Sequence, residues 1–421
     1  MTFAIKGDIL YSKSLNKVSQ NENSYIVCVD GKSEGVFKKL PAKYKGIKIY
    51  DYSGHIVIPG LVDIHLHAPQ YSFIGLHMDL KLLDWLNKYT FPAESKYKDL
   101  NFAKKAYDIF VDDLKKTATT RFAMFATIHN DATLYLMSRL EKVGFKGYVG
   151  KVNMDRNSPK ILVEKTKNSV KDTILWIEAC KKFKNIKPIL TPRFIPSCTD
   201  ELMSELSNIM KTYNLPVQSH LSENRSEIEW VKELMPSVSN YEEAYDRFEM
   251  LGSVTNTIMA HYVWPDEKGI ELMKDRKVWV AHSPSSNRNL GSGIAPIGRY
   301  LKEGVKVGLA TDVAGGSYLS MFRAIEDTIT ASKIRNSLID DKYASVTIEQ
   351  ALYIATISGG EFFGKVGSFD KGYEFDAIVL DEKDIPTVLM PELNLLERFE
   401  RFIYRPKDKV LAKFIAGKKV V

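Results

Sequence analysis

Eight short runs of β-branched and apolar residues, each followed by a helical stretch, constrain the fold of this 421-residue chain more than any other feature. The runs cover residues 55–65, 119–128, 146–153, 187–194, 215–221, 256–263, 277–282 and 305–311. Amphipathic stretches such as 100–116 and 159–184 lie between them, with apolar residues recurring at i, i+3, i+4 and i+7. Eight strands that alternate with helices predict an α/β fold of the (β/α)8 TIM barrel type.

The two ends of the chain do not follow this rhythm. Short β-like pieces separated by polar turns occupy residues 3–10, 24–29, 48–52, 377–380 and 409–415. Because neither end is long enough to bury a core alone, we expect them to pair into one small β-sandwich domain. The predicted division assigns residues 1–54 and 365–421 to this β domain and residues 55–364 to the catalytic barrel.

Composition excludes several classes of protein. The net charge of +7 is spread over 421 residues among acidic neighbours, so it does not predict nucleic-acid binding. No window approaches 18 uninterrupted apolar residues and no leader pattern opens the chain, which argues against a membrane protein. Cys28, Cys180 and Cys198 are odd in number and far apart, as in a reducing compartment, so we expect a soluble cytoplasmic protein.

A set of histidines and one aspartate falls at the ends of predicted barrel strands. His65 and His67 form a His-x-His motif on one face of the first strand, because side chains alternate with a period of two. His220 ends the fifth strand, His261 ends the sixth, and Asp312 follows the eighth. The carboxyl ends of barrel strands meet at one mouth, so these side chains can converge. The donor set suits Zn²⁺ with an open position for water, and leaves Fe²⁺ and Mn²⁺ open.

Glu223 follows His220 by three residues and has two interpretations. It is either a solvated residue beside a helix cap at Ser222, or a proton shuttle beside a metal-activated water. In the second interpretation Asp312 orients the water and accepts its proton. The motifs GxSxG, GxGxxG, HExxH, the P-loop and the PCxxC half of a deaminase zinc site are all absent, so the corresponding chemistries are excluded.

Five segments together resemble the metal-dependent amidohydrolase superfamily: PGLVDIHLHAPQ (59–70), SHLSE (219–223), MAH (259–261), HSPSSN (282–287) and TDVAGG (311–316). Within it, the blocks at 79–95, 126–129, 150–155 and 191–194 are similar to the guanine deaminase family. Residues 367–381 and 416–421 are similar to the superfamily's small β domain, so the resemblance covers nearly the whole chain.

The resemblance narrows the expected metal site. Amidohydrolases with two metals usually carry a carboxylated lysine on the fourth strand, but KPILTPRF (187–194) has no lysine after Lys187. The resemblance therefore implies a single metal ion, with His261 contacting the water or the intermediate by a hydrogen bond. The implied ligands are His65, His67, His220 and Asp312.

The resemblance also implies the reaction, which is hydrolytic deamination of guanine to xanthine and ammonia with Glu223, Asp312 and His261 as catalytic residues. The implied substrate contacts are Gln70, Arg193, Phe194, His67, His220 and Glu223. The amide of Gln70 can bond both donors and acceptors on a purine edge, and the guanidinium of Arg193 can donate to a carbonyl oxygen. The aromatic ring of Phe194 can stack on the purine.

Several alternatives remain open from the residues alone. Arg193 could be a structural ion-pair partner and Phe194 a barrel-layer residue, while Trp85 and Phe91 fit either a pocket wall or a packed loop. A different substrate on the same scaffold, such as a pterin, a cytosine-like pyrimidine or an s-triazine, would use the same metal and proton-transfer residues. A non-catalytic purine-binding barrel is the alternative of another class. A homodimer is implied by the family resemblance only.

Overall fold

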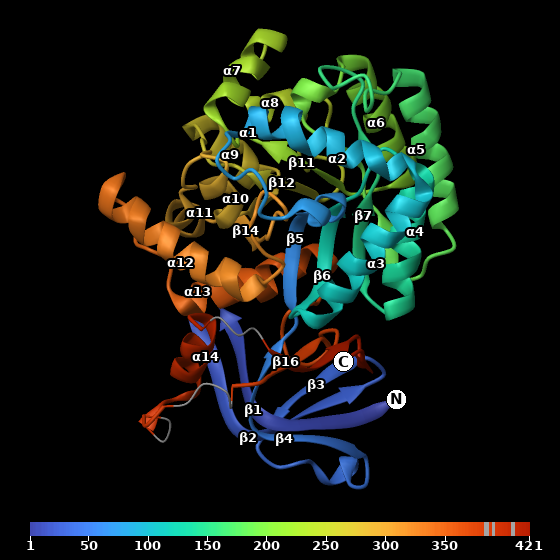
Figure 1. The fold of residues 1–421 in the computed structure, drawn as a ribbon. Coiled ribbons are helices and arrows are strands. Elements are labelled where there is room, and N and C mark those ends of the chain that lie inside the picture. The colour runs from blue at the N-terminus through green and yellow to red at the C-terminus, as the bar shows by residue number, and fades with distance from the viewer. Residues whose placement is uncertain (383–386, 390–391, 406–408) are drawn as a thin grey trace.

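The computed structural model describes residues 1–382, 387–389, 392–405 and 409–421. It contains a barrel of parallel strands wrapped by helices, and below it a separate sheet in which both chain ends lie together (Figure 1). The predicted fold class, an α/β TIM barrel with a small β domain made from both chain termini, is confirmed, and the strands of that domain, predicted as a sandwich, form one seven-stranded sheet. Within the described residues, no helix is both long and apolar enough to cross a membrane.

Parallel strands form the barrel in chain order, and two of the eight are interrupted. The third consists of β7 and β8, and the fourth of β9 and β10, so both irregular strands lie beside each other. Leu190 bridges to Val217 between the fourth and fifth strands, and Asp312 N–H donates to His65 O at 2.9 Å to close the ring. The barrel strands are β5 (Leu61–His67), β6 (Thr119–Phe125), β7 (Lys146–Gly150), β8 (Val152–Asn153), β9 (Ile186–Pro188), β10 (Thr191–Pro192), β11 (Val217–Leu221), β12 (Thr257–His261), β13 (Trp279–His282) and β14 (Lys306–Leu309).

Amphipathic helices cover the outside of the barrel. Helix α3 matches the stretch predicted at 100–116, and Asp99 caps it by accepting from Asn101 N–H at 2.8 Å. The stretch predicted at 159–184 is helical only over Thr166–Cys180. The surrounding helices are α3 (Leu100–Lys116), α4 (Asn130–Val143), α5 (Thr166–Cys180), α6 (Asp200–Tyr213), α7 (Arg225–Leu234), α8 (Tyr241–Asp246), α9 (Glu267–Asp275), α10 (Pro284–Asn289), α11 (Ile297–Glu303), α12 (Met321–Leu338) and α13 (Ile348–Tyr353).

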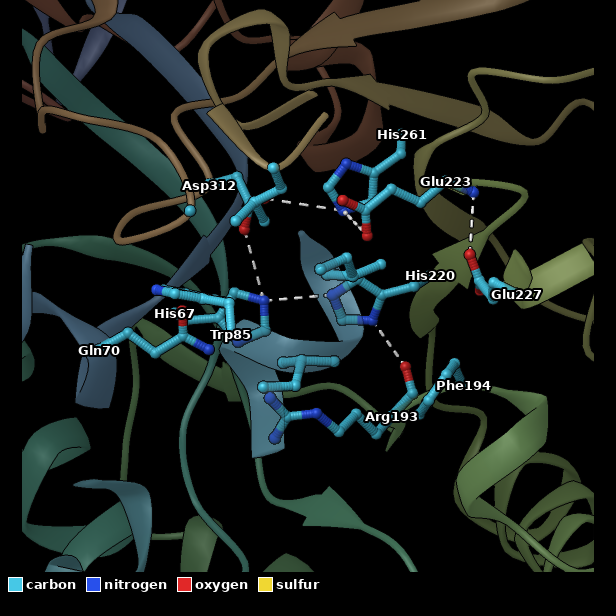
Figure 2. Close-up of a pocket in the computed structure, with 14 residues that line it drawn as sticks. His67, Gln70, Trp85, Arg193, Phe194, His220, Glu223, Glu227, His261 and Asp312 are labelled. Carbon is cyan, nitrogen blue, oxygen red and sulfur yellow. Dashed lines mark hydrogen bonds and ion pairs between the residues drawn. The ribbon is translucent and has the colours of Figure 1, made fainter. Parts of the chain in front are cut away.

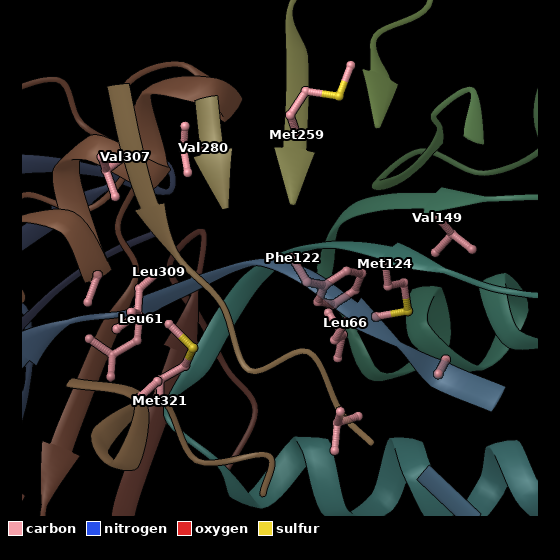
Figure 3. Close-up of a cluster of buried hydrophobic side chains, with 14 of the residues drawn as sticks. Leu61, Leu66, Phe122, Met124, Val149, Met259, Val280, Val307, Leu309 and Met321 are labelled. Atoms are coloured by element: carbon pink, nitrogen blue, oxygen red, sulfur yellow. The ribbon is translucent and has the colours of Figure 1, made fainter. Parts of the chain in front are cut away.

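The main hydrophobic core fills the layer between strands and helices. Figure 3 shows part of it, with side chains from successive barrel strands packing together. A second apolar cluster, which includes Val62, Ile64, Ile258 and Ala310, fills the barrel interior. Burial on both faces explains why the barrel strands read as near-continuous apolar runs in the sequence.

The terminal sheet has the order β17-β16-β15-β4-β1-β2-β3. It is strongly curved, because the rings of Phe3 and Phe414 lie 5.6 Å apart although their strands are three positions apart, about 14 Å in a flat sheet. The curvature lets one face of the sheet bury an aromatic core of its own. The sheet comprises β1 (Thr2–Ser14), β2 (Lys17–Val29), β3 (Lys32–Phe37), β4 (Lys48–Pro59), β15 (Ala377–Leu380), β16 (Val410–Ile415) and β17 (Lys418–Lys419), with α14 (Leu395–Ile403) beside it.

The prediction of a barrel strand that begins at residue 55 is wrong in its first five residues. Residues 55–59 belong to β4, which pairs with β1 and β15 in the terminal sheet. The chain passes to β5 at Gly60, where a side chain would overlap the hydroxyl of Thr120, because a Cβ there would lie 2.1 Å from Oγ1. The division of the chain at residues 54 and 364 stays a prediction.

Candidate active site

A cavity opens at the carboxyl ends of the barrel strands. Figure 2 shows its lining side chains, with Gln70 and Arg193 on one side and Glu223 and His261 on the opposite side. The lining combines polar groups from the strand ends with apolar groups from the long loop after β5. It comprises His67, Gln70, Leu82, Trp85, Leu86, Arg193, Phe194, His220, Glu223, Glu227, His261, Leu290, Asp312 and Gly315.

The five predicted metal-site residues converge at the bottom of this cavity. Asp312 Oδ1 lies 3.1 Å from His65 Nε2 and 3.5 Å from His67 Nε2, and His67 Nε2 lies 3.2 Å from His220 Nε2. His261 Nε2 lies 3.6 Å from Asp312 Oδ2. Two overlapping groups, His65 with His67 and Asp312, and His65 with His220 and His261, each hold their donor atoms within 4.8 Å of one another.

A register shift in β5 brings both histidines of the His-x-His motif to the mouth. Val62 and Ile64 point into the barrel interior and Leu66 points to the helices. The pairing of β5 with β6 shifts between Asp63 and Leu66, and from there His65 and His67 both face the cluster. Asp63 supports this irregular stretch, because its carboxylate accepts from Thr311 Oγ1 at 2.6 Å and from Thr311 N–H at 3.1 Å.

The donor atoms fit a divalent metal ion. Two ligands that are each 2.0–2.1 Å from an ion at a tetrahedral angle lie about 3.3 Å apart, close to the spacings in this cluster. Burial lowers the pKa of His67 and His220 well below the usual value, so both imidazoles are neutral and suited to ligation. Both ring nitrogens of the buried His65 lack a hydrogen-bond partner among the described residues. A neutral imidazole has a free lone pair on one ring nitrogen only, and an ion bound to Nε2, the nitrogen that faces Asp312, would satisfy that one.

Neighbouring groups fix which ring nitrogens face the cluster. His220 Nδ1–H donates to the carbonyl oxygen of Arg193 at 2.6 Å, and His261 Nδ1–H donates to Asn287 Oδ1 at 2.9 Å. Since a carbonyl oxygen only accepts, the proton sits on Nδ1 and Nε2 faces the cluster. Such outer partners orient metal-site histidines in proteins generally.

Backbone strain occurs at two of the clustered residues. His261 has φ +75° and Asp312 has φ +46°, a region that non-glycine residues rarely occupy. Both residues end or follow a barrel strand, and the turn in the backbone directs their side chains into the mouth. Strain of this kind concentrates at functional sites, where the surrounding structure holds it.

Glu223 lies beside His261 rather than in solvent. Its Oε2 lies 3.4 Å from His261 Nε2, Ser292 Oγ donates to its Oε1 at 2.9 Å, and only 3% of the residue is exposed. Burial raises the pKa of Glu223 to about 7, against the opposing effect of His261. The carboxyl can therefore both give and take a proton near neutral pH. The interpretation of Glu223 as a solvated residue beside a cap is wrong.

Asp312 and His261 have pKa values that favour their charged forms. Burial alone would raise the pKa of Asp312, but the imidazoles of His65, His261 and His67 outweigh it and hold that pKa far below the usual value. Burial opposes charge on His261, yet the carboxylates of Glu223 and Asp312 raise its pKa. The site thus contains one carboxyl that is ionised at neutral pH and one that titrates near neutrality.

Gln70, Arg193 and Phe194 all line the cavity, and a residue missed in the sequence connects the first two. Buried Glu94 accepts from Arg193 Nη1 at 2.7 Å, from Arg193 Nη2 at 3.1 Å and from Gln70 Nε2 at 2.9 Å. The guanidinium also lies over the ring of Phe91, with 4.8 Å from its carbon to the centroid. Arg193 is therefore both a cavity residue and an ion-pair partner.

Sequence reasoning also missed Asp63, Asn287, Glu227 and Ser292. Asn287 lies within the HSPSSN segment, which the resemblance includes, but the segment carries no signal for a contact with His261. Trp85 lines the cavity and is 2% exposed, so it is a pocket wall. His129 and His282 do not line this cavity.

A parallel barrel with a histidine and aspartate cluster at its carboxyl mouth defines a metal-dependent hydrolase of the amidohydrolase type. A model of the amidohydrolase family matches residues 56–420. The chain belongs to the amidohydrolase family.

Several similar proteins with curated names are guanine deaminases. The chain is 40% identical to guanine deaminase of Mus musculus over 395 residues, covering 90% of this chain and 86% of the mouse protein. It is 35% identical to guanine deaminase of Dictyostelium discoideum over 443 residues, covering 99% and 97%. A crystal structure of guanine deaminase from C. acetobutylicum with guanine bound in its active site superimposes with a TM-score of 0.97, at 43% identity and full coverage of both chains. The resemblance found in the sequence is confirmed.

Proposed function

We propose that this protein hydrolyses guanine to xanthine and ammonia. The observation that carries the proposal is the cluster of His65, His67, His220 and Asp312 beside the buried Glu223, in a chain 43% identical over its full length to a guanine deaminase structure with guanine bound. Hydrolysis of a pterin, a pyrimidine or an s-triazine would use the same cluster, but the curated relatives named above are guanine deaminases.

One Zn²⁺ held by His65, His67, His220 and Asp312 is the proposed cofactor, and Fe²⁺ or Mn²⁺ would suit the same donors. The bound ion supplies Lewis acidity that lowers the pKa of a water molecule and polarises the reacting centre. His261 contacts the water or the intermediate by a hydrogen bond in this assignment. The contact of its Nδ1 with Asn287 and the 3.4 Å approach of its Nε2 to Glu223 support that role.

The chain's own groups carry the protons. Asp312, which is ionised before the reaction, accepts a proton from the attacking water, and the water oxygen forms a bond to purine C2. Glu223 in its protonated form donates to the adjacent ring nitrogen, and the tetrahedral centre at C2 forms. Glu223, now ionised, takes the hydroxyl proton of the tetrahedral centre and passes it to the 2-amino group as the C2–N bond breaks, so ammonia leaves and xanthine with its C2 carbonyl results. The proton held by Asp312 then returns to Glu223, which restores both carboxyl groups to their starting states.

The proposed substrate contacts are distributed around the cavity. Arg193 donates to an acceptor on the purine, Gln70 offers its amide, and Phe194 packs against the ring. His67, His220 and Glu223 contact the end of the purine that reacts. All six residues line the same cavity, which supports this assignment.

We further propose a cytoplasmic homodimer. The dimer rests on the family resemblance alone. The location rests on three free and buried thiols, Cys28, Cys180 and Cys198, which suit a reducing compartment.

The test is ammonia release from guanine, cytosine, adenine, pterin and an s-triazine by the purified zinc-loaded protein. We expect guanine to be turned over fastest, with xanthine appearing in equal amount to ammonia. Glu223→Gln is the matched control for contaminating activity, because it retains the fold and removes the titrating carboxyl. Rapid turnover of another substrate without turnover of guanine would refute the proposal.

A further inference from the structure

The buried carboxylate of Glu94 accepts hydrogen bonds from two residues that line the cavity. It lies on α2 (Phe91–Ser95), in the long segment between β5 and α3, and is 2% exposed. It takes two hydrogen bonds from Arg193 and one from Gln70, and it does not line the cavity itself. It therefore acts on a ligand only through these two residues.

The orientation of the Gln70 amide is fixed from both ends. Since a carboxylate accepts and does not donate, the atom of Gln70 that faces Glu94 must be the nitrogen. At the other end Gln70 Oε1 accepts from the backbone N–H of Ala314 at 3.3 Å. Turning the amide over would place oxygen against the carboxylate and an NH₂ group against an N–H. The oxygen of Gln70 has a second lone pair, which remains for a ligand.

Arg193 is fixed in the same way. Two of the five N–H groups of its guanidinium donate to Glu94, and the plane of the guanidinium lies over the ring of Phe91. The remaining N–H groups are donors that a ligand can use. Arg193 Nη2 and Gln70 Nε2 both bond the same oxygen, Oε1 of Glu94, so the two side chains are neighbours. Together they present a donor and an acceptor side by side along one wall of the cavity.

We propose that Glu94 is a specificity-determining positioning residue: by holding Arg193 as a donor beside Gln70 Oε1 as an acceptor, it selects 6-oxopurines over 6-aminopurines. A 6-oxopurine carries an acceptor, O6, beside a donor, N1–H, which complements this pair. A 6-aminopurine carries the reverse order, so donor would meet donor and acceptor would meet acceptor. This inference rests on the proposed function, because it assigns Gln70 and Arg193 to the purine.

The test is equilibrium binding of two purines that differ at this edge, measured by calorimetry on the zinc-loaded protein. Hypoxanthine has the 6-oxo edge and no 2-amino group to lose, and adenine has the 6-amino edge. The variant is Glu94→Gln. Its amide has one accepting oxygen in place of two, so it cannot accept all the hydrogen bonds that Arg193 and Gln70 donate to the carboxylate. The preference for hypoxanthine over adenine should fall about tenfold or more, while adenine affinity changes less than about threefold.

The matched control is Glu382→Gln, since Glu382 is also a buried glutamate that bonds one arginine, Arg398, but lies outside the barrel. It should keep the wild-type preference, and both variants should retain metal. If Glu94→Gln does not fold, Glu94→Asp keeps the charge but shortens the reach, and its preference for hypoxanthine should fall below that of the wild type and of Glu382→Gln.

The outcomes separate the two proposals. A wild-type preference in whichever Glu94 variant folds, or an equal loss for both purines, would overturn the role of Glu94 even if guanine is turned over. A wild-type protein that neither deaminates guanine nor binds hypoxanthine would overturn the proposed function instead.

Discussion

Replacing Asn287 with leucine should slow catalysis without removing the metal. The Asn287 side chain is 1% exposed, and its Oδ1 is the acceptor for Nδ1–H of His261 at 2.9 Å. Leucine has nearly the same size and no acceptor. Nδ1–H of the equally buried His261 would then be unsatisfied, or its proton would move to Nε2, the nitrogen that faces Glu223 and Asp312.

The size of the effect follows from the lost contact. A hydrogen bond that involves a charged group contributes about 1.5–3 kcal/mol, and carboxylates at 3.4 and 3.6 Å favour charge on His261. At about 1.4 kcal/mol for each factor of ten, kcat should fall about 10- to 150-fold. Asn287→Asp keeps an acceptor oxygen at the same place and should recover most of the rate.

Steady-state kinetics and metal analysis on the same preparations would check this prediction. Asn153→Leu is the control, because Asn153 is another buried asparagine whose Nδ2 bonds Ser169 and Thr173 and which does not touch His261. A kcat within threefold of wild type, or an equal loss in Asn153→Leu, would refute the reasoning. Loss of metal along with rate would place His261 among the ligands.

Three further predictions concern other buried charges. Glu223→Gln should retain metal and lose about 10²- to 10⁴-fold in kcat, measured by xanthine formation; near wild-type turnover would place the shuttle elsewhere. Arg193→Ala should raise KM at least about tenfold while metal content, measured by atomic absorption, stays constant, because the contact with His220 comes from the backbone carbonyl. Burial raises the pKa of Glu242 from 4.5 to about 7. Between these two pH values the folded state therefore keeps a proton that the unfolded state has lost. The free energy of unfolding should fall by up to about 3 kcal/mol as the pH rises through this window. Denaturant titrations at pH 5 and pH 8 should therefore show a smaller pH dependence for Glu242→Gln than for wild type, and an unchanged dependence would contradict the assignment.

The barrel was predictable because its strands carry a strong local signal. Buried parallel strands are apolar on both faces, and the alternation with amphipathic helices leaves few topologies. The error at residues 55–59 has a physical cause, since IVIPGLV (56–62) is one run without polar side chains in which β4 ends and β5 begins. Burial alone does not distinguish two sheets, and the change of sheet at Gly60 depends on its close approach to Thr120.

The residues of the metal cluster were predictable for a related reason. Each of them lies within the last three residues of a strand or shortly after one, and barrel geometry converts that position into a shared location. Glu94 and Asn287 carry no such signal. Glu94 lies in a short helix within a long loop, and Asn287 lies in a short helix after β13, so their partners Arg193 and His261 are brought to them only by the tertiary fold.

Arg193 contacts both the histidine cluster and the proposed substrate wall, but with different atoms. Its carbonyl oxygen holds the Nδ1 proton of His220, while its guanidinium is held by Glu94 and Phe91. The two functions use different atoms, so a side-chain substitution can alter the substrate wall and leave the orientation of His220 intact. A change that moves the backbone after β10 would disturb both at once. In the proposed assignment, the strand end therefore orients a metal ligand through its backbone, and the side chain at the same position contacts the base.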